Sequence, residues 1–370
     1  MTALEPLSNC QFCSVVSKIN GEDPIGTAGN HEHWLILEAA LPWSEKLMEE
    51  PAIKPLITLI KKLILEQQVK LRPIVIAPDR EYSRAGYNRV LYYHQPTHSF
   101  AQFEKQEYWV PEADTTRLAT ALLEKIAGHP NELDVFQSYQ IDSQHIRELL
   151  VCTHGNVDIA CSRFGFPIYK TLRDKYAPES AGSLRVWRCS HFGGHQFAPT
   201  LIDLPQGQYW GHLEPNLLDL LVYRQGELAQ LRSCYRGWSG LEKFAQMVER
   251  EIWLREGWNW LDYRKAGQIL SSDPGGVSRY LYRLLRQIPS NRLQFLINQR
   301  SHKPKWAEIR IEFSSPDGTD VGAYEARVEV CGEVISALQS GGHAHVSQRQ
   351  RLKLQPVKQY RVSQLRRCDG

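Results

Sequence analysis

Short apolar runs alternate with longer amphipathic stretches along residues 33–128. Three of the runs are rich in β-branched and aromatic residues and are bounded by Pro, Asp or Asn, which is typical of strands: HWLILEAA, RPIVIAP and RVLYYHQ. Two stretches place apolar residues at the spacing of a helix: AIKPLITLIKKLILEQQ and TTRLATALLEKIAG. The pattern predicts the order strand, helix, strand, strand, helix.

The same order is repeated in residues 145–228. The predicted strands are HIRELLVC, LRVWRCS and TLIDLPQGQYWGHL, and the predicted helices are FPIYKTLRDKYA and EPNLLDLLVYRQ. Pro167 suits the first turn of the first of these helices. The tripeptide PQG is a turn signal, so we expect a hairpin within the third strand segment.

Each half therefore reads βαββα, with one parallel crossover followed by a hairpin and a covering helix, which is the core of the thioredoxin-like architecture. Beyond these halves a Trp-rich helical stretch over residues 240–270 precedes PGGVSRYLYRLLRQI and three alternating strand-like segments. The predicted fold class is α/β, with tandem thioredoxin-like modules followed by a smaller α+β C-terminal domain. The predicted domains are residues 1–135, 136–235 and 236–370.

Composition and charge fit a soluble globular protein, with 42% apolar and 23% charged residues among 370. The net charge is only +3, so nothing global points to nucleic acid or to an anionic membrane. The N-terminal sequence lacks the basic and apolar parts of a signal peptide, and no apolar run is long enough to span a bilayer. We therefore expect a reducing, cytoplasmic compartment and no membrane partner.

Eight cysteines in a chain of this length are too few for a disulfide scaffold, so clustered cysteines indicate metal or redox groups. The motif CQFC, from Cys10 to Cys13, is similar to a thioredoxin redox motif, but it precedes the first predicted strand instead of following it. We interpret it as a tail with incidental cysteines. Thiol oxidoreductase activity or metal binding through Cys10 and Cys13 is the alternative.

Four residues with soft ligand atoms fall in two loops of the second module. Cys152 ends the first predicted strand of this module, and Cys161 opens the helix that follows. His191 and His195 lie in the loop after the second strand. Because the C-terminal ends of parallel strands lie at the same edge of a sheet, we expect both loops to converge there. The four residues predict a metal or cluster site.

The spacing of these residues favours an iron–sulfur cluster over zinc. Zinc fingers usually draw their cysteines from short knuckles and their histidines from a helix. Here the cysteines flank an eight-residue loop, and two adjacent glycines lie between the histidines. Glycines allow close approach of the backbone and leave amide N–H groups free to bond a bridging sulfide. A Cys2His2 zinc site stays open as the alternative.

The segments VCTHGNVDIAC and HFGGHQFAPTLIDLPQGQYWGHLEPNLLDLL resemble the thioredoxin-like [2Fe–2S] ferredoxins. In those proteins a spaced cysteine pair and a later C-x3-C before an AP dipeptide hold the cluster. Cys152 and Cys161 match the first pair, and His191 and His195 stand where the second pair would be. This substitution is similar to that of the sucrase/ferredoxin-like family, whose members carry a bis-histidinyl [2Fe–2S] cluster. Residues 8–232 as a whole look like that family.

The resemblance implies an electron-transfer protein with a [2Fe–2S] cluster on those four residues. Replacing two thiolates with neutral imidazoles removes two negative charges, so we expect a raised reduction potential. An iron-bound imidazole has a second nitrogen that can release a proton, so we expect the potential to depend on pH. The complete Rieske ligand pattern is absent. Cys189 and His154 are the alternative ligands.

We expect an electron carrier more than an enzyme with its own substrate, and we assign no catalytic residues. The alternative is a non-redox interaction protein that binds zinc through the same four ligands. The implied partners are an electron donor and an electron acceptor, which the sequence does not identify. Residues 349–367 are basic, lack acidic side chains and alternate with apolar residues as in an edge strand. This strand is a candidate dock for an acidic partner, with nucleic acid as the weaker choice.

Overall fold

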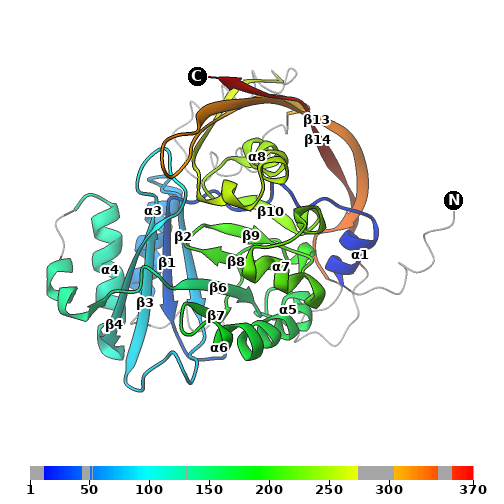
Figure 1. Ribbon diagram of the computed structural model, residues 1–370. Helices are drawn as coiled ribbons and strands as arrows, with labels where there is room; N and C mark the ends of the chain where they lie inside the picture. Colours follow the sequence, from blue (N-terminus) through cyan, green and yellow to red (C-terminus); the bar gives the residue numbers. More distant parts are fainter. Residues whose placement is uncertain are drawn as a thin grey trace.

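The computed structural model describes residues 12–43, 51, 53–129, 132–273, 304–340 and 352–369. They form a mixed α/β fold with a large ten-stranded sheet and a separate four-stranded antiparallel sheet (Figure 1). The strand order of the large sheet is β10-β9-β8-β6-β7-β2-β1-β3-β4-β5, and that of the small sheet is β11-β12-β13-β14. The α/β class expected from the sequence is confirmed.

The first module is built around β1 (His33–Glu38), which is parallel to β2 (Leu71–Ile76) and antiparallel to β3 (Tyr87–His94). The crossover between β1 and β2 contains α3 (Lys54–Leu65), whose Leu56, Ile60 and Leu63 are buried. Helix α4 (Thr115–Ile126) covers the same core. The parallel crossover expected from the hydrophobic pattern is therefore present.

One strand of this module was missing from the expected pattern. Strand β4 (Glu104–Pro111) pairs antiparallel with β3 along its whole length. Its sequence, EKQEYWVP, does not look like a buried strand, because Lys105 and Glu107 point into the interior and are only 2% and 1% exposed. These charges are compensated by partners from other strands, which a local pattern cannot show.

The second module repeats the arrangement around β6 (Arg147–Cys152), which is parallel to β7 (Leu184–Cys189) and antiparallel to β8 (Leu201–Leu204). Strand β9 (Gln208–Trp210) completes the hairpin predicted at PQG, where Gly207 has a φ of +79°. Helix α7 (Leu218–Tyr223) follows. Strands β2 and β7 join the two modules into one sheet through the pair Ile76 and Cys189.

The position predicted for Pro167 is wrong. Helix α5 runs from Ile159 to Thr171, so Pro167 lies inside it and not in its first turn. The helix begins early because the carboxylate of Asp158 accepts a hydrogen bond from the amide of Ala160 at 2.9 Å. A capped and packed helix tolerates the lost hydrogen bond of an internal proline.

The C-terminal part follows the predicted order of helix before strands, with one correction. Helix α8 (Lys243–Glu256) ends at Gly257, whose φ is +87°, and the expected continuation to residue 270 is instead strand β11 (Arg264–Ser272). The three predicted strand segments are confirmed as β12 (Trp306–Ser314), β13 (Val321–Ala337) and β14 (Leu354–Asp369). The predicted segment PGGVSRYLYRLLRQI lies outside the described residues. The division of the chain into three domains stays a prediction.

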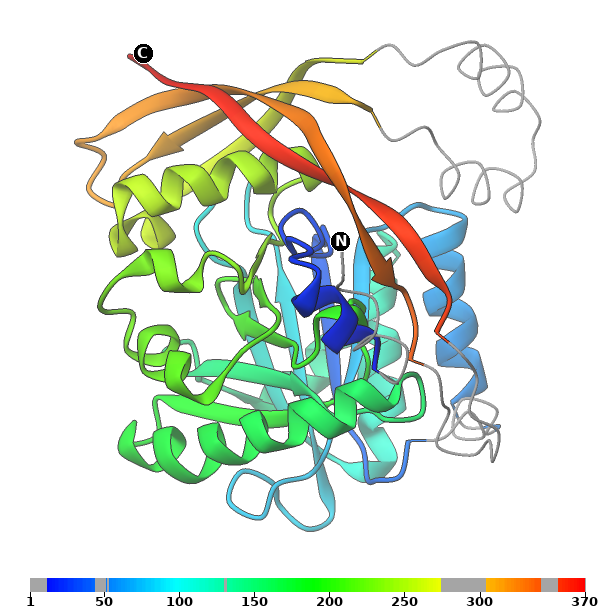
Figure 2. The same cartoon turned by 90° about the vertical axis from the view of Figure 1, so that its right-hand side faces the viewer.

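The long strands β13 and β14 arch over α8 and reach the N-terminal helix α1 (Cys13–Ile19), as the two perpendicular views show (Figures 1 and 2). The basic side chains of β14 form ion pairs with acidic groups on or before β13: Arg361 with Glu329, Arg366 with Glu325, and Arg367 with Asp320. Arg361 and Arg366 keep most of their side-chain surface exposed. An acidic partner for this strand stays a prediction.

Shorter elements complete the described chain: η1 (Glu112–Asp114), η2 (Leu133–Tyr139), β5 (Gln140–Ile141), the π-helical η3 (Leu172–Tyr176), α6 (Ala177–Glu179), η4 (His195–Phe197), η5 (Pro215–Leu217), η6 (Leu228–Leu231), β10 (Tyr235–Trp238) and η7 (Trp258–Asp262). Within the described ranges, no helix has the length and apolar character needed to cross a membrane.

Candidate metal centre

The predicted ligands gather at the carboxyl edge of β6 and β7. Cys152 is the last residue of β6 and is paired in register with Cys189, the last residue of β7. Cys161 lies in the first turn of α5. The loop that contains His191 and His195 follows β7 directly. Because β6 and β7 are parallel, both loops emerge at the same edge of the sheet.

Three of the four residues form a compact donor group. The Nδ1 atom of His191 lies 3.9 Å from Sγ of Cys152 and 3.7 Å from Sγ of Cys161, and the three donor atoms all lie within 4.8 Å of one another. Both thiols are fully buried. The contact between them lowers the pKa of Cys152 and raises that of Cys161, so one thiol of the pair loses its proton first. Two thiols and an imidazole are donors suited to a soft or borderline metal.

His195 belongs to a second, neighbouring donor group. Its Nδ1 atom lies 3.3 Å from Oδ2 of Asp158 and 3.4 Å from Sγ of Cys13, and these three donor atoms also lie within 4.8 Å of one another. The ring centroids of His191 and His195 are 5.5 Å apart, which places the two groups side by side. Burial lowers the pKa of His195, while Asp158 acts in the opposite direction. The neutral imidazole that a metal needs is therefore favoured.

The second group is held by residues from both ends of the chain. Ser340, just beyond β13, donates from its hydroxyl to Oδ1 of Asp158 at 2.6 Å and from its amide to Oδ2 at 2.8 Å. The amide of Cys13, at the start of α1, donates to the Ser340 hydroxyl at 3.2 Å. The carboxylate of Asp158 is thus fixed by α1, α5 and the end of β13 together, and its side chain is fully buried.

Two arginines bind the backbone of the histidine loop. The Nη1 atom of Arg236 donates to the carbonyl of Gly193 at 3.0 Å, and Nη2 of Arg72 donates to the carbonyl of His191 at 2.9 Å. Gly193 and Gly194 have φ values of +98° and +79°, and a Cβ at Gly194 would collide with the guanidinium of Arg236. The glycine at position 194 therefore makes room for a buried cation, a role that the sequence pattern did not indicate.

The two alternative ligands lie outside both donor groups. Cys189 is fully buried in the main core, and burial raises the pKa of its thiol well above the usual range. The Nε2 atom of His154 faces the carbonyl of Trp43 at 3.2 Å, and its Nδ1 faces the amide of His191 at 3.5 Å. Substitution of either residue for a proposed ligand stays a prediction.

Sequence reasoning missed two residues of this centre, Asp158 and Arg236, and considered Cys13 only as part of the CQFC motif. Asp158 could have been found, since an aspartate directly before a helical stretch is an N-cap signal. The place of Cys13 beside His195 could not have been found, because this contact joins positions 182 residues apart. The other cysteine of the CQFC motif, Cys10, lies outside the described residues.

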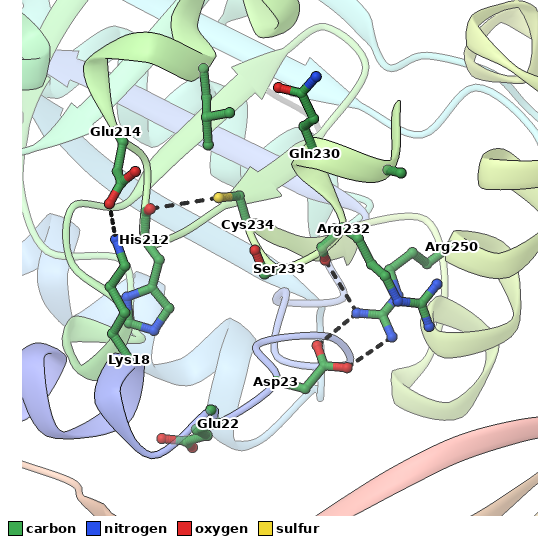
Figure 3. Close-up of a pocket in the computed structure, with 13 residues that line it drawn as sticks. Lys18, Glu22, Asp23, His212, Glu214, Gln230, Arg232, Ser233, Cys234 and Arg250 are labelled. Atoms are coloured by element: carbon green, nitrogen blue, oxygen red, sulfur yellow. Dashed lines mark hydrogen bonds and ion pairs between the residues drawn. The ribbon is translucent and has the colours of Figure 1, made fainter. Parts of the chain in front are cut away.

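A cavity of about 550 Å³ opens on the other side of α1, between this helix and the segments around His212 and Cys234 (Figure 3). Four of its charged lining groups are paired with one another, because Lys18 pairs with Glu214 and Arg250 pairs with Asp23. Among the described residues, the groups with metal-ligand spacing lie beside His191 and His195 and not in the lining of this cavity.

Comparison with known proteins agrees with this geometry. The family model described as sucrase/ferredoxin-like matches residues 24–237, more than half of the chain, and this range includes β6, β7 and the loops that carry both cysteines and both histidines. No curated protein and no solved structure matches the chain. From the match and the Cys/His groups that could bind a metal, we conclude that the chain belongs to the sucrase/ferredoxin-like family.

Proposed function

We propose that the protein is an electron carrier that holds a [2Fe–2S] cluster on Cys152, Cys161, His191 and His195. The observation that supports this most is the presence of two adjacent donor groups at one sheet edge. One ion would favour a single group of four donors, whereas a two-iron cluster has two protein ligands on each iron. The two imidazoles belong to different donor groups, but their ring centroids are only 5.5 Å apart, and both come from a loop separate from that of the two thiols, which suits the second arrangement.

When bound, such a cluster supplies reversible one-electron chemistry. The chain contributes burial of both thiols and a partly exposed imidazole, since the His195 side chain is 17% exposed. It also contributes positive charge, because Arg72 and Arg236 bind the backbone of the histidine loop. Neutral ligands and nearby cations both favour the reduced state, so we expect a raised potential.

A visible spectrum together with metal and sulfide analysis of freshly purified protein tests the proposal. We expect a red-brown protein that dithionite bleaches, with about two irons and two sulfides per chain, as the cluster stoichiometry requires. Cys161→Ser removes a proposed ligand and is expected to lose most of the colour. Cys234→Ser is the matched control, since this buried cysteine lies outside both donor groups. A colourless protein without sulfide would refute the proposal.

A second candidate function is zinc binding without redox activity. The observation that favours it is the compactness of the Cys152, Cys161 and His191 group, which resembles three ligands of one tetrahedral ion. The same metal analysis decides, because one zinc and no sulfide per chain would establish it. For thiol oxidoreductase activity the structure offers little support, because burial raises the pKa of Cys13 to about 12.

A further inference from the structure

We propose that Cys13 is a reserve metal ligand for the position of His195. When His195 is detached or replaced, the sulfur of Cys13 takes its place and the thiol gives up its proton, so the centre is then held by three cysteines and His191. This inference rests on the metal centre of the proposed function. It adds a fifth protein donor, contributed by the N-terminal helix.

The position of the Cys13 sulfur supports this role. Its Sγ lies 3.4 Å from Nδ1 of His195, so a small movement of the Cys13 side chain would carry the sulfur to the position of the His195 ligand atom. Together with Asp158 these residues already form a group with metal-ligand spacing. Thiolate sulfur is a stronger iron–sulfur ligand type than carboxylate oxygen, so Cys13 is the natural replacement in this group.

Packing fixes Cys13 in this place. Cys13 and Val16 are fully buried in one apolar cluster with Ala160, Ala198 and Ala337. Ala160 precedes Cys161 in α5, and Ala198 follows the histidine loop. The helix that carries Cys13 therefore rests on both segments that supply the proposed ligands. Figure 2 shows α1 lying against these segments beneath β13 and β14.

The exchange needs no oxidant or reductant. The bond between iron and the imidazole nitrogen breaks, a bond between iron and Sγ of Cys13 forms, and the thiol proton leaves. Oδ2 of Asp158 lies 3.7 Å from Sγ and is the acceptor of the thiol hydrogen, so this carboxylate can take the proton and pass it to water. The net result is a neutral ligand replaced by an anionic one, which lowers the reduction potential.

The test compares His195→Ala, His195→Ala/Cys13→Ser and His195→Ala/Cys234→Ser by iron and sulfide content. We expect the single variant and the Cys234 control to keep at least half of the wild-type iron, and the Cys13 double variant to keep less than a fifth. We expect His191→Ala to lose as much iron as His195→Ala/Cys13→Ser. Cys13 lies in the donor group of His195 and not in that of His191, so it cannot replace His191. Thermal unfolding of each protein checks that it is folded.

Electron paramagnetic resonance of reduced His195→Ala gives a readout that does not depend on the double variant. We expect coupling to one histidine nitrogen instead of two, and a potential below that of the wild type. The inference would be overturned if His195→Ala lost as much iron as His195→Ala/Cys13→Ser. It would also be overturned if both variants kept the same amount of iron. A wild-type protein without iron would instead refute the proposed cluster. The same variants loaded with zinc would then decide whether Cys13 replaces His195 as a metal ligand.

Discussion

The carboxylate of Asp158 caps helix α5 and also faces Nδ1 of His195. Asparagine caps helices about as well as aspartate, so Asp158→Asn removes the charge while keeping the cap. Asp158 raises the pKa of His195 against the lowering effect of burial. Without this charge the imidazole releases its proton more easily, so the fall of the reduction potential with rising pH should begin at a lower pH.

Redox titrations over a range of pH check this prediction. Asp174→Asn is the control, because Asp174 is exposed and pairs with Lys170 away from the metal centre. An unchanged pH profile in Asp158→Asn would show that His195 is not the group whose proton is coupled to the electron.

Arg236 is a second residue whose charge acts on the site. The residue is 2% exposed, and its guanidinium donates hydrogen bonds to the carbonyl oxygens of Gly193 and Thr27. Two unit charges about 10 Å apart interact by roughly 1.7 kcal/mol at an effective dielectric constant of about 20. For a one-electron couple, 59 mV corresponds to a tenfold change in equilibrium constant, so Arg236→Gln should lower the potential by about 70 mV.

Protein-film voltammetry measures this shift, with Arg232→Gln as the control for an exposed arginine that pairs with Glu251. Arg236→Lys keeps the charge and should keep most of the potential even if the loop relaxes. A fall of the same size in Arg236→Lys would indicate that loop geometry, and not charge, sets the potential.

At the scale of elements, α1 is a short helix that is held in place by buried side chains, Val16 among them. Val16 is fully buried, whereas Ile19 in the same helix is 61% exposed. We expect Val16→Ala to destabilise the protein by about 1–3 kcal/mol and Ile19→Ala to have little effect. Because α1 covers the second donor group, Val16→Ala should also speed the removal of metal by a chelator and the hydrogen exchange of the α1 amides. Equal chelation rates in the two variants would show that α1 does not protect the centre.

The elements also show which parts of the fold and site could be predicted from sequence. Three local patterns pointed to one edge of the sheet: Cys152 at the end of a strand, Cys161 at the start of a helix, and a histidine loop after the next strand. In the structure these residues lie at the carboxyl edge of β6 and β7. Strand β4 was missed because its inward charges are compensated by distant strands. The contact between Cys13 and Ser340 joins residues 327 positions apart, and no local pattern reports it.

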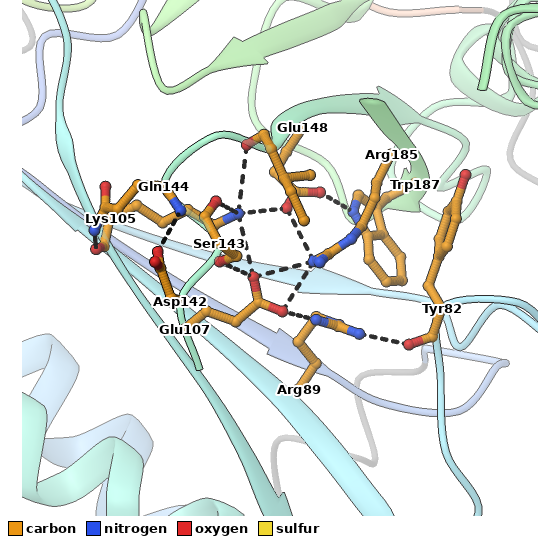
Figure 4. A network of polar contacts seen from close by, with 11 residues as sticks. Tyr82, Arg89, Lys105, Glu107, Asp142, Ser143, Gln144, Glu148, Arg185 and Trp187 are labelled. Atoms are coloured by element: carbon orange, nitrogen blue, oxygen red, sulfur yellow. Dashed lines mark hydrogen bonds and ion pairs between the residues drawn. The ribbon is translucent and has the colours of Figure 1, made fainter. Parts of the chain in front are cut away.

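At the scale of the whole molecule, a buried ion network connects the two modules (Figure 4). The carboxylate of Glu148 in β6 accepts three hydrogen bonds. The donors are Lys105 of β4 at 2.7 Å, Arg185 of β7 at 3.2 Å and the indole N–H of Trp187 at 2.6 Å. Glu107 of β4 bonds the same lysine and arginine. Since β4 belongs to the first module and β6 and β7 to the second, this network and the shared sheet should make the modules unfold together.

Glu148→Gln tests this cooperativity. The substitution leaves Lys105 and Arg185 with less negative charge in a dry interior, so we expect a loss of about 3–5 kcal/mol of unfolding free energy. The control is Glu132→Gln, because Glu132 is 65% exposed and pairs with Arg117. Urea unfolding followed by far-ultraviolet circular dichroism and by metal release should give one coincident transition in wild type, shifted to lower urea in Glu148→Gln. If metal release kept its wild-type midpoint while the circular dichroism transition moved, the second module would be stable alone, and the network would stabilise only the first.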